Sequence, residues 1–365
     1  MDNDENWSRI LIIKTGALGD VLRTTSILPG LRAVHGAGLD ITWVTAHAAR
    51  PLLEGLVGTE ITDLLAVDPK DNEAIAGLGE RLGPGSFDRI LSLDDEPPLC
   101  ALATALADGQ VEPRVIGAYV AADTDGERTY TKAAAPWFDM GLLSTFGKAE
   151  ADRLKIANTR SHPEIYAAML GIPMGEPLLR LDDEVLTSAA ARLASRSGSM
   201  IGLNTGAGGR WRSKALPEER VVALARQLDL HLQASDGQRP TFVLLGGPEE
   251  RERNERLAAA VGGADGVLLV DPGCDNPLLD FAGLISGLDL LITSDSLALH
   301  MATARKVPTV AFFAPTSAAE IELYGRGEKI ASTAPDACSY ARDADTSTLT
   351  VERLIEAALS VLDRK

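Results

Sequence analysis

The sequence predicts an α/β protein made of two doubly wound domains. Short apolar runs alternate with amphipathic, helix-like stretches through both halves of the chain, the pattern of parallel strands joined by crossover helices. The length of 365 residues suits two domains better than one. Glycine and proline are dense at 171–177, where we place the linker. We therefore predict domains at 1–172 and 173–365, with a ligand-binding cleft between them.

The composition limits the classes of partner. Hydrophobic residues make up 45% of the chain, enough for two buried cores. The 35 Lys and Arg residues against 52 Asp and Glu give a formal net charge of −17. This balance disfavours a nonspecific binder of nucleic acid or of anionic membranes. A local basic pocket for a small phosphate ligand stays compatible with it.

Neither a metal centre nor a disulfide framework is indicated. Cys100, Cys274 and Cys338 are scattered without a C-x-x-C motif, and the five histidines form no metal-binding pattern. No apolar run reaches membrane-spanning length, and the chain starts with acidic rather than signal-like residues. We expect a cytoplasmic protein without an integral membrane segment, a metal or a cofactor, and we leave its oligomeric state open.

The elements of the first predicted domain follow from local patterns. A helix is expected at 20–35, kinked by Pro29, and another at 46–56. Strands are expected at 9–14, 40–44, 63–68, 87–94 and 115–120. The stretch 117–177 carries few strand signals, although it includes Trp137 and a helical pattern at 163–170. It reads either as an irregular segment packed on this domain, which we favour, or as an insertion that faces the acceptor.

The second predicted domain repeats this alternation. Strands are expected at 200–206, 241–245, 267–271, 288–293 and 307–313. Helices are expected at 182–196, 217–230, 250–261, 277–286, 295–305 and 350–362.

One glycine-bearing loop follows the first strand. Lys14, Thr15, Gly16 and Gly19 lead into a helix whose first turn carries the carboxylate of Asp20. The spacing lacks the third glycine of a dinucleotide fingerprint, which argues against a Rossmann dehydrogenase. Taken alone, the loop reads either as a ligand-binding strand-to-helix turn or as glycines chosen for backbone geometry.

Four loops of the second half can carry chemistry. The stretch 206–214 places Lys214 and two arginines beside glycines, which suits a phosphate, or is a solvated basic loop. The stretch 246–249 ends in Glu249, which either accepts bonds from a ribose or starts a helix. The stretch 293–300 opens a helix where free N–H groups can bind an anion. Hydroxyl groups at 313–317 can reach phosphate oxygens, but loops of this composition are common.

Together these stretches resemble glycosyltransferase family 9, the ADP-heptose:lipopolysaccharide heptosyltransferase family. The resemblance covers nearly the whole chain. Its specific parts are 12–22, 206–214, 294–302, 308–316 and 320–328. It implies a GT-B fold, two Rossmann-like domains facing a central cleft, with the acceptor on the first domain and the nucleotide sugar on the second. It also implies inverting, metal-independent transfer.

The resemblance assigns roles to individual residues. Asp20 matches the general base, Lys214 matches the lysine that meets the diphosphate, and Glu249 lies where a ribose-binding acid is expected. The nucleotide-sugar-binding residues it implies are Gly206, Gly208, Gly209, Arg210, Lys214, Glu249, Asn276, Asp295, Ser296, Leu297 and His300. The acceptor-side loop it implies is Lys14, Thr15, Gly16 and Gly19.

Two departures from the family pattern stand out. Leu297 occupies a position where glycine is usual, so its side chain can crowd the phosphate or indicate a different sugar nucleotide. Some relatives carry a cysteine-rich metal-binding segment near Cys338, where this chain keeps a single cysteine. The resemblance therefore implies no structural metal.

The resulting expectation is transfer of a sugar, a heptose in the first place, from a nucleotide-diphosphate donor such as ADP-heptose to an acceptor hydroxyl. Lipopolysaccharide core, a protein side chain and a small metabolite are the acceptors considered. Two other classes stay open: a non-catalytic relative that binds sugar nucleotides, and a GT-B epimerase or hydrolase acting on one.

Overall fold

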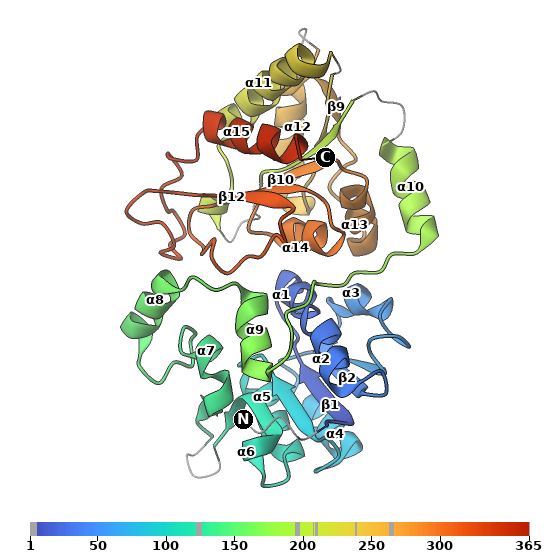
Figure 1. The fold of residues 1–365 in the computed structure, drawn as a ribbon, viewed down its shortest axis with the longest axis vertical. Coiled ribbons are helices and arrows are strands. Elements are labelled where there is room, and N and C mark those ends of the chain that lie inside the picture. Colours follow the sequence, from blue (N-terminus) through green and yellow to red (C-terminus); the bar gives the residue numbers. More distant parts are fainter. Residues whose placement is uncertain are drawn as a thin grey trace. The chain divides into compact units, whose positions relative to one another are not determined.

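The computed structural model describes residues 6–121, 126–193, 198–206, 208, 211–237, 239–262 and 266–364. The chain divides into two compact units, Met1–Arg180 and Leu181–Lys365. Figure 1 shows the first unit in blue to green and the second in yellow-green to red. Each unit is an α/β domain built on one six-stranded sheet.

The division falls after Arg180, whereas the sequence pattern places it after residue 172. The segment between these two positions belongs to the first unit because it forms hydrogen bonds with that unit. The Leu178 N–H donates to Thr25 Oγ1 at 2.7 Å. The guanidinium of Arg180 donates to Thr59 Oγ1 at 2.7 Å.

The first sheet has the Rossmann strand order, extended by one antiparallel strand. In spatial order its strands are β3 (Asp63–Val67), β2 (Asp40–Ala46), β1 (Arg9–Ile13), β4 (Arg89–Ser92), β5 (Val115–Val120) and β6 (Arg128–Tyr130). Only the β5–β6 pair is antiparallel. The order reverses between β1 and β4, which makes their carboxyl ends the topological switch point.

Both faces of this sheet are buried. Along β1, Ile10 and Ile12 belong to one apolar cluster, whereas Leu11 and Ile13 belong to the cluster on the opposite face. Such double burial is the property of a parallel sheet covered by helices on both sides. The helices of this unit are α1 (Leu18–Thr24), α2 (Ile27–His35), α3 (Arg50–Glu54), α4 (Asn72–Leu82), α5 (Pro97–Leu106), α6 (Val111–Arg114), α7 (Ala135–Phe138), α8 (Lys148–Ala157) and α9 (His162–Leu170).

The predicted single kinked helix at 20–35 is wrong in one respect: the structure has two helices. The break lies at Thr25 and Ser26, and Pro29 is the third residue of the second helix. Proline has no N–H for a carbonyl four residues back, which here is the carbonyl of Thr25. That carbonyl instead accepts a 3.0 Å bond from the Leu28 N–H, which closes a tight turn.

The stretch 128–172 is more regular than the sequence pattern suggests. It adds β6 to the sheet edge and contributes α7, α8 and α9. Phe138 and Tyr166 are buried in the core cluster that also holds Ile10. This segment is therefore part of the first domain, as the favoured interpretation has it, but it is largely helical.

The second sheet repeats the Rossmann order with all strands parallel. In spatial order its strands are β9 (Leu268–Val270), β8 (Thr241–Leu244), β7 (Met200–Asn204), β10 (Leu290–Ser294), β11 (Thr309–Phe313) and β12 (Gly327–Ala331). Its helices are α10 (Asp183–Leu193), α11 (Glu218–Asp236), α12 (Arg251–Val261), α13 (Leu278–Ser286), α14 (Leu297–Ala304) and α15 (Val351–Leu362). The order reverses between β7 and β10, so a ligand site is expected at their carboxyl ends.

Candidate functional site

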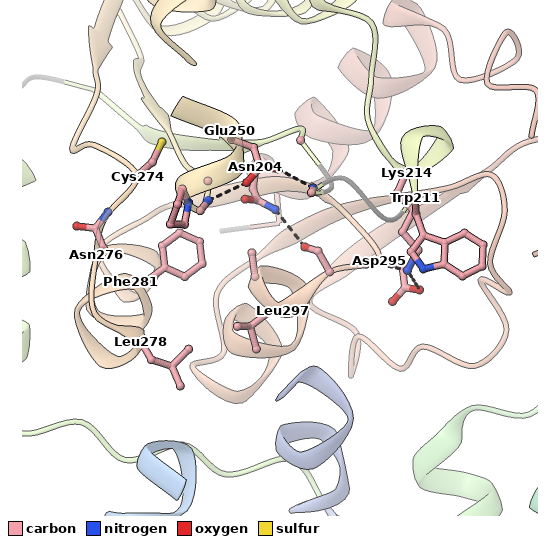
Figure 2. Close-up of a pocket in the computed structure, with 17 residues that line it drawn as sticks. Asn204, Trp211, Lys214, Glu250, Cys274, Asn276, Leu278, Phe281, Asp295 and Leu297 are labelled. Atoms are coloured by element: carbon pink, nitrogen blue, oxygen red, sulfur yellow. Dashed lines mark hydrogen bonds and ion pairs between the residues drawn. The ribbon is translucent and has the colours of Figure 1, made fainter. Parts of the chain in front are cut away.

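A pocket of about 440 Å³ opens beyond the carboxyl ends of β7 and β10. Its volume lies within the range of small-molecule sites. Figure 2 shows Lys214, Trp211 and Asp295 on one side and Phe281, Leu278 and Asn276 on the other. The predicted residues that line it are Gly206, Gly208, Lys214, Asn276, Asp295, Ser296 and Leu297. Gly209 and Arg210 lie outside the described residues.

The pocket holds a positioned cation. Lys214 Nζ donates to the Asp295 carbonyl at 2.8 Å and to Asp295 Oδ2 at 2.9 Å. Both side chains are less than one-fifth exposed. His300 Nε2 lies 3.8 Å from Asp295 Oδ1. Asp295 therefore links the predicted lysine to the predicted histidine, and His300 stands behind the pocket rather than in its lining.

The amino end of α14 is arranged by a second polar group. Asn204, the last residue of β7, donates to Thr293 Oγ1 and to Ser296 Oγ, both at 3.0 Å. The two hydroxyls lie 3.1 Å apart. Ser296 occupies the N-cap position, yet its side chain makes no capping bond to the helix. The N–H groups of the first turn of α14 are thus not taken up by that hydroxyl, which suits an anion at the helix start.

Two glycine loops are tied together by one carboxylate that sequence reasoning missed. Glu250 Oε1 accepts the Gly208 N–H at 2.6 Å, and Glu250 Oε2 accepts the Gly247 N–H at 2.9 Å. Figure 2 shows both bonds. A Cβ atom on Gly206 would lie 2.3 Å from Glu250 Cγ. Glycine is needed there because the Glu250 side chain passes against the backbone.

The predicted ribose acid and the acid in the pocket are neighbours in sequence. Glu250 lines the pocket, whereas Glu249 does not. Glu249 lies beside the glycine loop, since a Cβ atom on Gly208 would come within 3.0 Å of Glu249 Oε2. A weak signal for Glu250 was present: a Glu three residues after the N-cap can accept the N–H of that residue, as Glu250 does for Gly247, although glycine has no side chain to complete a capping box.

The rest of the pocket wall is apolar or already hydrogen-bonded. Trp211, Phe281 and Leu297 present apolar surface. Asn276 uses both ends of its amide: it donates to the Gly273 carbonyl at 2.7 Å and accepts from Arg192 at 2.7 Å. No local pattern points to the aromatic pair, because Trp211 and Phe281 come from segments far apart in the chain.

The loop of the first unit that is predicted to face the acceptor is organised by a buried ion pair. Lys14 and Asp94 are both 7% exposed, and their side chains form a salt bridge. Lys14 Nζ also donates to the Gly16 carbonyl at 2.5 Å. Asp94 accepts from the Thr15 N–H and, at 2.7 Å, from the Thr15 hydroxyl. The side chains of Lys14 and Thr15 thus hold the loop, and Asp94 was not among the predicted site residues.

Burial changes the titration of a carboxyl next to this ion pair. Desolvation, together with the nearby charge of Asp94, raises the pKa of Glu96 above its ordinary value. Asp94 and Glu96 follow β4, and Lys14 follows β1, so all three stand at the switch point of the first sheet.

Asp20 lies in the first turn of α1, next to this loop. Its side chain is 38% exposed, and its Oδ1 pairs with Arg23 at 3.0 Å. The Ala17 N–H donates to Asp20 Oδ2 at 3.3 Å. A carboxylate that ligands can reach can take a proton from a hydroxyl bound within hydrogen-bond distance. Gly19 falls within α1, and a Cβ atom on Gly16 would meet nothing within 4 Å.

Metal-site arrangements and membrane-spanning helices are absent from the described part of the chain. No group of three or more His, Cys, Asp or Glu residues there has the arrangement of a metal site. None of the helices described there combines the length and apolarity that a membrane span requires.

The chain is similar to known heptosyltransferases. It is 25% identical to lipopolysaccharide heptosyltransferase 1 from Pseudomonas aeruginosa, covering 88% of this chain and 82% of that one. Among solved structures, the family 9 glycosyltransferase from Veillonella parvula matches with a TM-score of 0.71 at 20% identity, over 98% of both chains. ADP-heptose lipopolysaccharide heptosyltransferase II from E. coli matches with a TM-score of 0.65 at 18% identity, over 98% of this chain and 99% of that one.

The structural matches establish the fold, two Rossmann-like domains of the GT-B class. The model of glycosyltransferase family 9 (heptosyltransferase) matches residues 149–350, which is more than half of the chain. This match includes the whole pocket with Lys214, Glu250 and Asp295. The protein belongs to glycosyltransferase family 9.

Proposed function

We propose that this glycosyltransferase transfers a heptose from ADP-heptose to an acceptor hydroxyl, with inversion at the anomeric carbon and without a metal ion. The observation that carries the proposal is the Lys214–Asp295 pair beside the amino end of α14. A nucleotide diphosphate needs a cation and N–H donors at one place, and this pocket supplies both.

Lys214 has the donor count for a diphosphate ligand. An ammonium group has three N–H bonds, and two of those on Lys214 point to oxygen atoms of Asp295. The third is left for a phosphate oxygen. Asp295 keeps the ammonium in one place, so little reorganisation is needed when negative charge grows on the leaving diphosphate.

The apolar walls suit the nucleoside. Trp211 and Phe281 offer ring faces on which a base can stack. Of the two neighbouring glutamates, Glu250 lines the pocket and Glu249 does not, so we assign to Glu250 the contact with the ribose hydroxyls. We choose ADP-heptose because the E. coli relative is named an ADP-heptose heptosyltransferase.

The chemical step needs a base on the acceptor side, and we assign that role to Asp20. As the acceptor oxygen bonds to the anomeric carbon, its proton passes to the carboxylate of Asp20 and the diphosphate leaves with the electron pair. A carboxylate is a weak base, because the ordinary pKa of an aspartate side chain is about 3.9, so proton transfer accompanies bond formation. Lipopolysaccharide core is the acceptor we propose, following the name of the Pseudomonas relative.

A thermal-shift panel tests the donor. ADP-heptose and ADP should raise the melting temperature more than UDP-, GDP- or TDP-sugars, because a ligand at about 100 times its Kd stabilises by about 2.7 kcal/mol. A response to uridine nucleotides alone would contradict the adenine assignment.

A transfer assay tests the reaction. Transfer from ADP-heptose to lipopolysaccharide core should continue in excess EDTA, and NMR of the product should show an inverted anomeric configuration. Loss of activity on chelation, restored by one divalent ion, would contradict the metal-independent mechanism. Rapid release of ADP without any acceptor would instead support an epimerase or hydrolase.

A further inference from the structure

The carboxylate of Asp20 is held by a side chain of its own helix. Arg23 lies one turn further along α1, and its guanidinium is 3.0 Å from Asp20 Oδ1. Exposed pairs of this spacing contribute little, because both side chains are free to move in water. This pair differs because Arg23 is only 15% exposed.

The guanidinium of Arg23 rests on an aromatic ring from a distant part of the chain. Its Cζ lies 5.6 Å from the ring centroid of Trp137, which belongs to α7. A guanidinium over an indole face is attracted to the negative face of the ring. Trp137 therefore limits where the cation can go.

Trp137 is in turn fixed by α9. Its ring meets His162 edge-on at 5.0 Å and Tyr166 edge-on at 5.4 Å. His162 and Tyr166 are each 1% exposed, and their ring centroids are 3.9 Å apart. Arg23 thus contacts Asp20 on its own helix and, through Trp137, an aromatic cluster whose other two members are buried. We call Trp137, His162 and Tyr166 the aromatic wall.

We propose that Arg23 is a positioning residue, which Trp137 fixes in place so that it orients the carboxylate of Asp20 toward the acceptor. This inference rests on the role of Asp20 in the proposed function. It also assigns a function to the stretch 128–172, because α7 and α9 contribute the residues of the aromatic wall.

The contacts leave room for the reaction. Oδ1 of Asp20 accepts from Arg23, and Oδ2 accepts from the Ala17 N–H at 3.3 Å. A carboxylate has about four lone-pair sites, so the acceptor hydroxyl can still bind. Arg23 gains and loses no proton, and the proton from the acceptor ends on Asp20.

Direct titration of Asp20 tests the proposal without relying on activity. Carboxyl carbons of Asp are labelled with ¹³C in the full chain, and comparison with Asp20→Asn assigns the Asp20 signal. In Arg23→Gln the pKa of Asp20 should rise by about one unit, because a cation close to a carboxylate favours its charged form. In Arg23→Lys the pKa of Asp20 should return part of the way to its native value. In Trp137→Ala the pKa of Asp20 should lie between the values of the native protein and Arg23→Gln.

The pH profile of kcat/KM gives a second readout. In Arg23→Gln the lower apparent pKa of this profile should rise by the same amount as the pKa of Asp20 measured by NMR. A merely structural defect would not shift this pKa. Trp137→Phe should behave like the native protein, because it keeps a ring face.

A matched control is available in α8. Arg153 and Glu150 form a pair of the same spacing, but Arg153 is 63% exposed. Arg153→Gln should change neither the titration of Asp20 nor the profile. An Asp20 titration that is the same in Arg23→Gln as in the native protein would overturn the positioning role. Full activity of Asp20→Asn would instead overturn the proposed base, and the titration would still decide whether Arg23 controls the carboxylate.

Discussion

At the scale of single residues, Asp20 carries the sharpest expectation. Asp20→Asn keeps the size of the side chain and removes its ability to take a proton. Transfer should fall by a factor of about 10² to 10⁴, the usual contribution of a general base. Initial rates at saturating donor measure this, with melting temperature as a control for folding. A variant that keeps most of its turnover would remove Asp20 from the base role.

Leu297 is a residue whose effect can be measured on the donor alone. It is the first residue of α14 and lines the pocket where the diphosphate is proposed to bind. Removing the side chain in Leu297→Gly should expose the N–H groups of the first turn. We expect ADP to bind about fivefold more tightly, since one improved hydrogen bond is worth about 1 kcal/mol. Calorimetry with ADP measures this, and weaker binding would mean that Leu297 packs against the ligand.

At the scale of elements, Gly206 shows how a loop depends on what packs against it. In Gly206→Ala the new methyl group would lie 2.3 Å from Glu250 Cγ, so Glu250 must leave the N–H groups of Gly208 and Gly247. Losing two bonds to a charged group should weaken ADP binding by about tenfold or more.

Gly77→Ala is the matched control for this prediction. Gly77 lies in α4, and a Cβ atom there meets nothing within 4 Å. Calorimetry should give the native ADP affinity for Gly77→Ala. Native affinity in Gly206→Ala as well would show that Glu250 does not hold the pocket together.

The elements themselves were largely predictable, and the exceptions have physical reasons. Apolar runs flanked by turn residues identified ten of the twelve described strands, because buried parallel strands need such runs. The two missed strands, β6 (Arg128–Tyr130) and β12 (Gly327–Ala331), lie at sheet edges. Neither is fully buried, so neither needs an apolar run.

Residues of the site could be predicted only where they belong to one continuous sequence motif. Lys214 and Asp295 come from recognisable loops. Asp94 does not, because it is 80 residues from Lys14 and meets it only since β1 and β4 are neighbours in the sheet. Strand order of this kind follows from the folded topology and leaves no local pattern in the sequence.

At the scale of the whole molecule, the two domains divide the work of the proposed reaction. The residues lining the pocket proposed for the nucleotide all belong to Leu181–Lys365, and Asp20 with the aromatic wall belongs to Met1–Arg180. A substitution can therefore be made in one set of residues at a time. This division is the central claim, and two variants separate its halves.

Calorimetry with ADP on Lys214→Ala and Asp20→Asn tests that claim most directly. Lys214→Ala removes the cation beside α14, and a hydrogen bond to a charged group is worth roughly 1.5–3 kcal/mol. Its affinity for ADP should fall by about one to two decades, while Asp20→Asn should bind ADP like the native protein. If Lys214→Ala keeps the native affinity while Asp20→Asn loses it, the donor and acceptor domains are the reverse of those proposed.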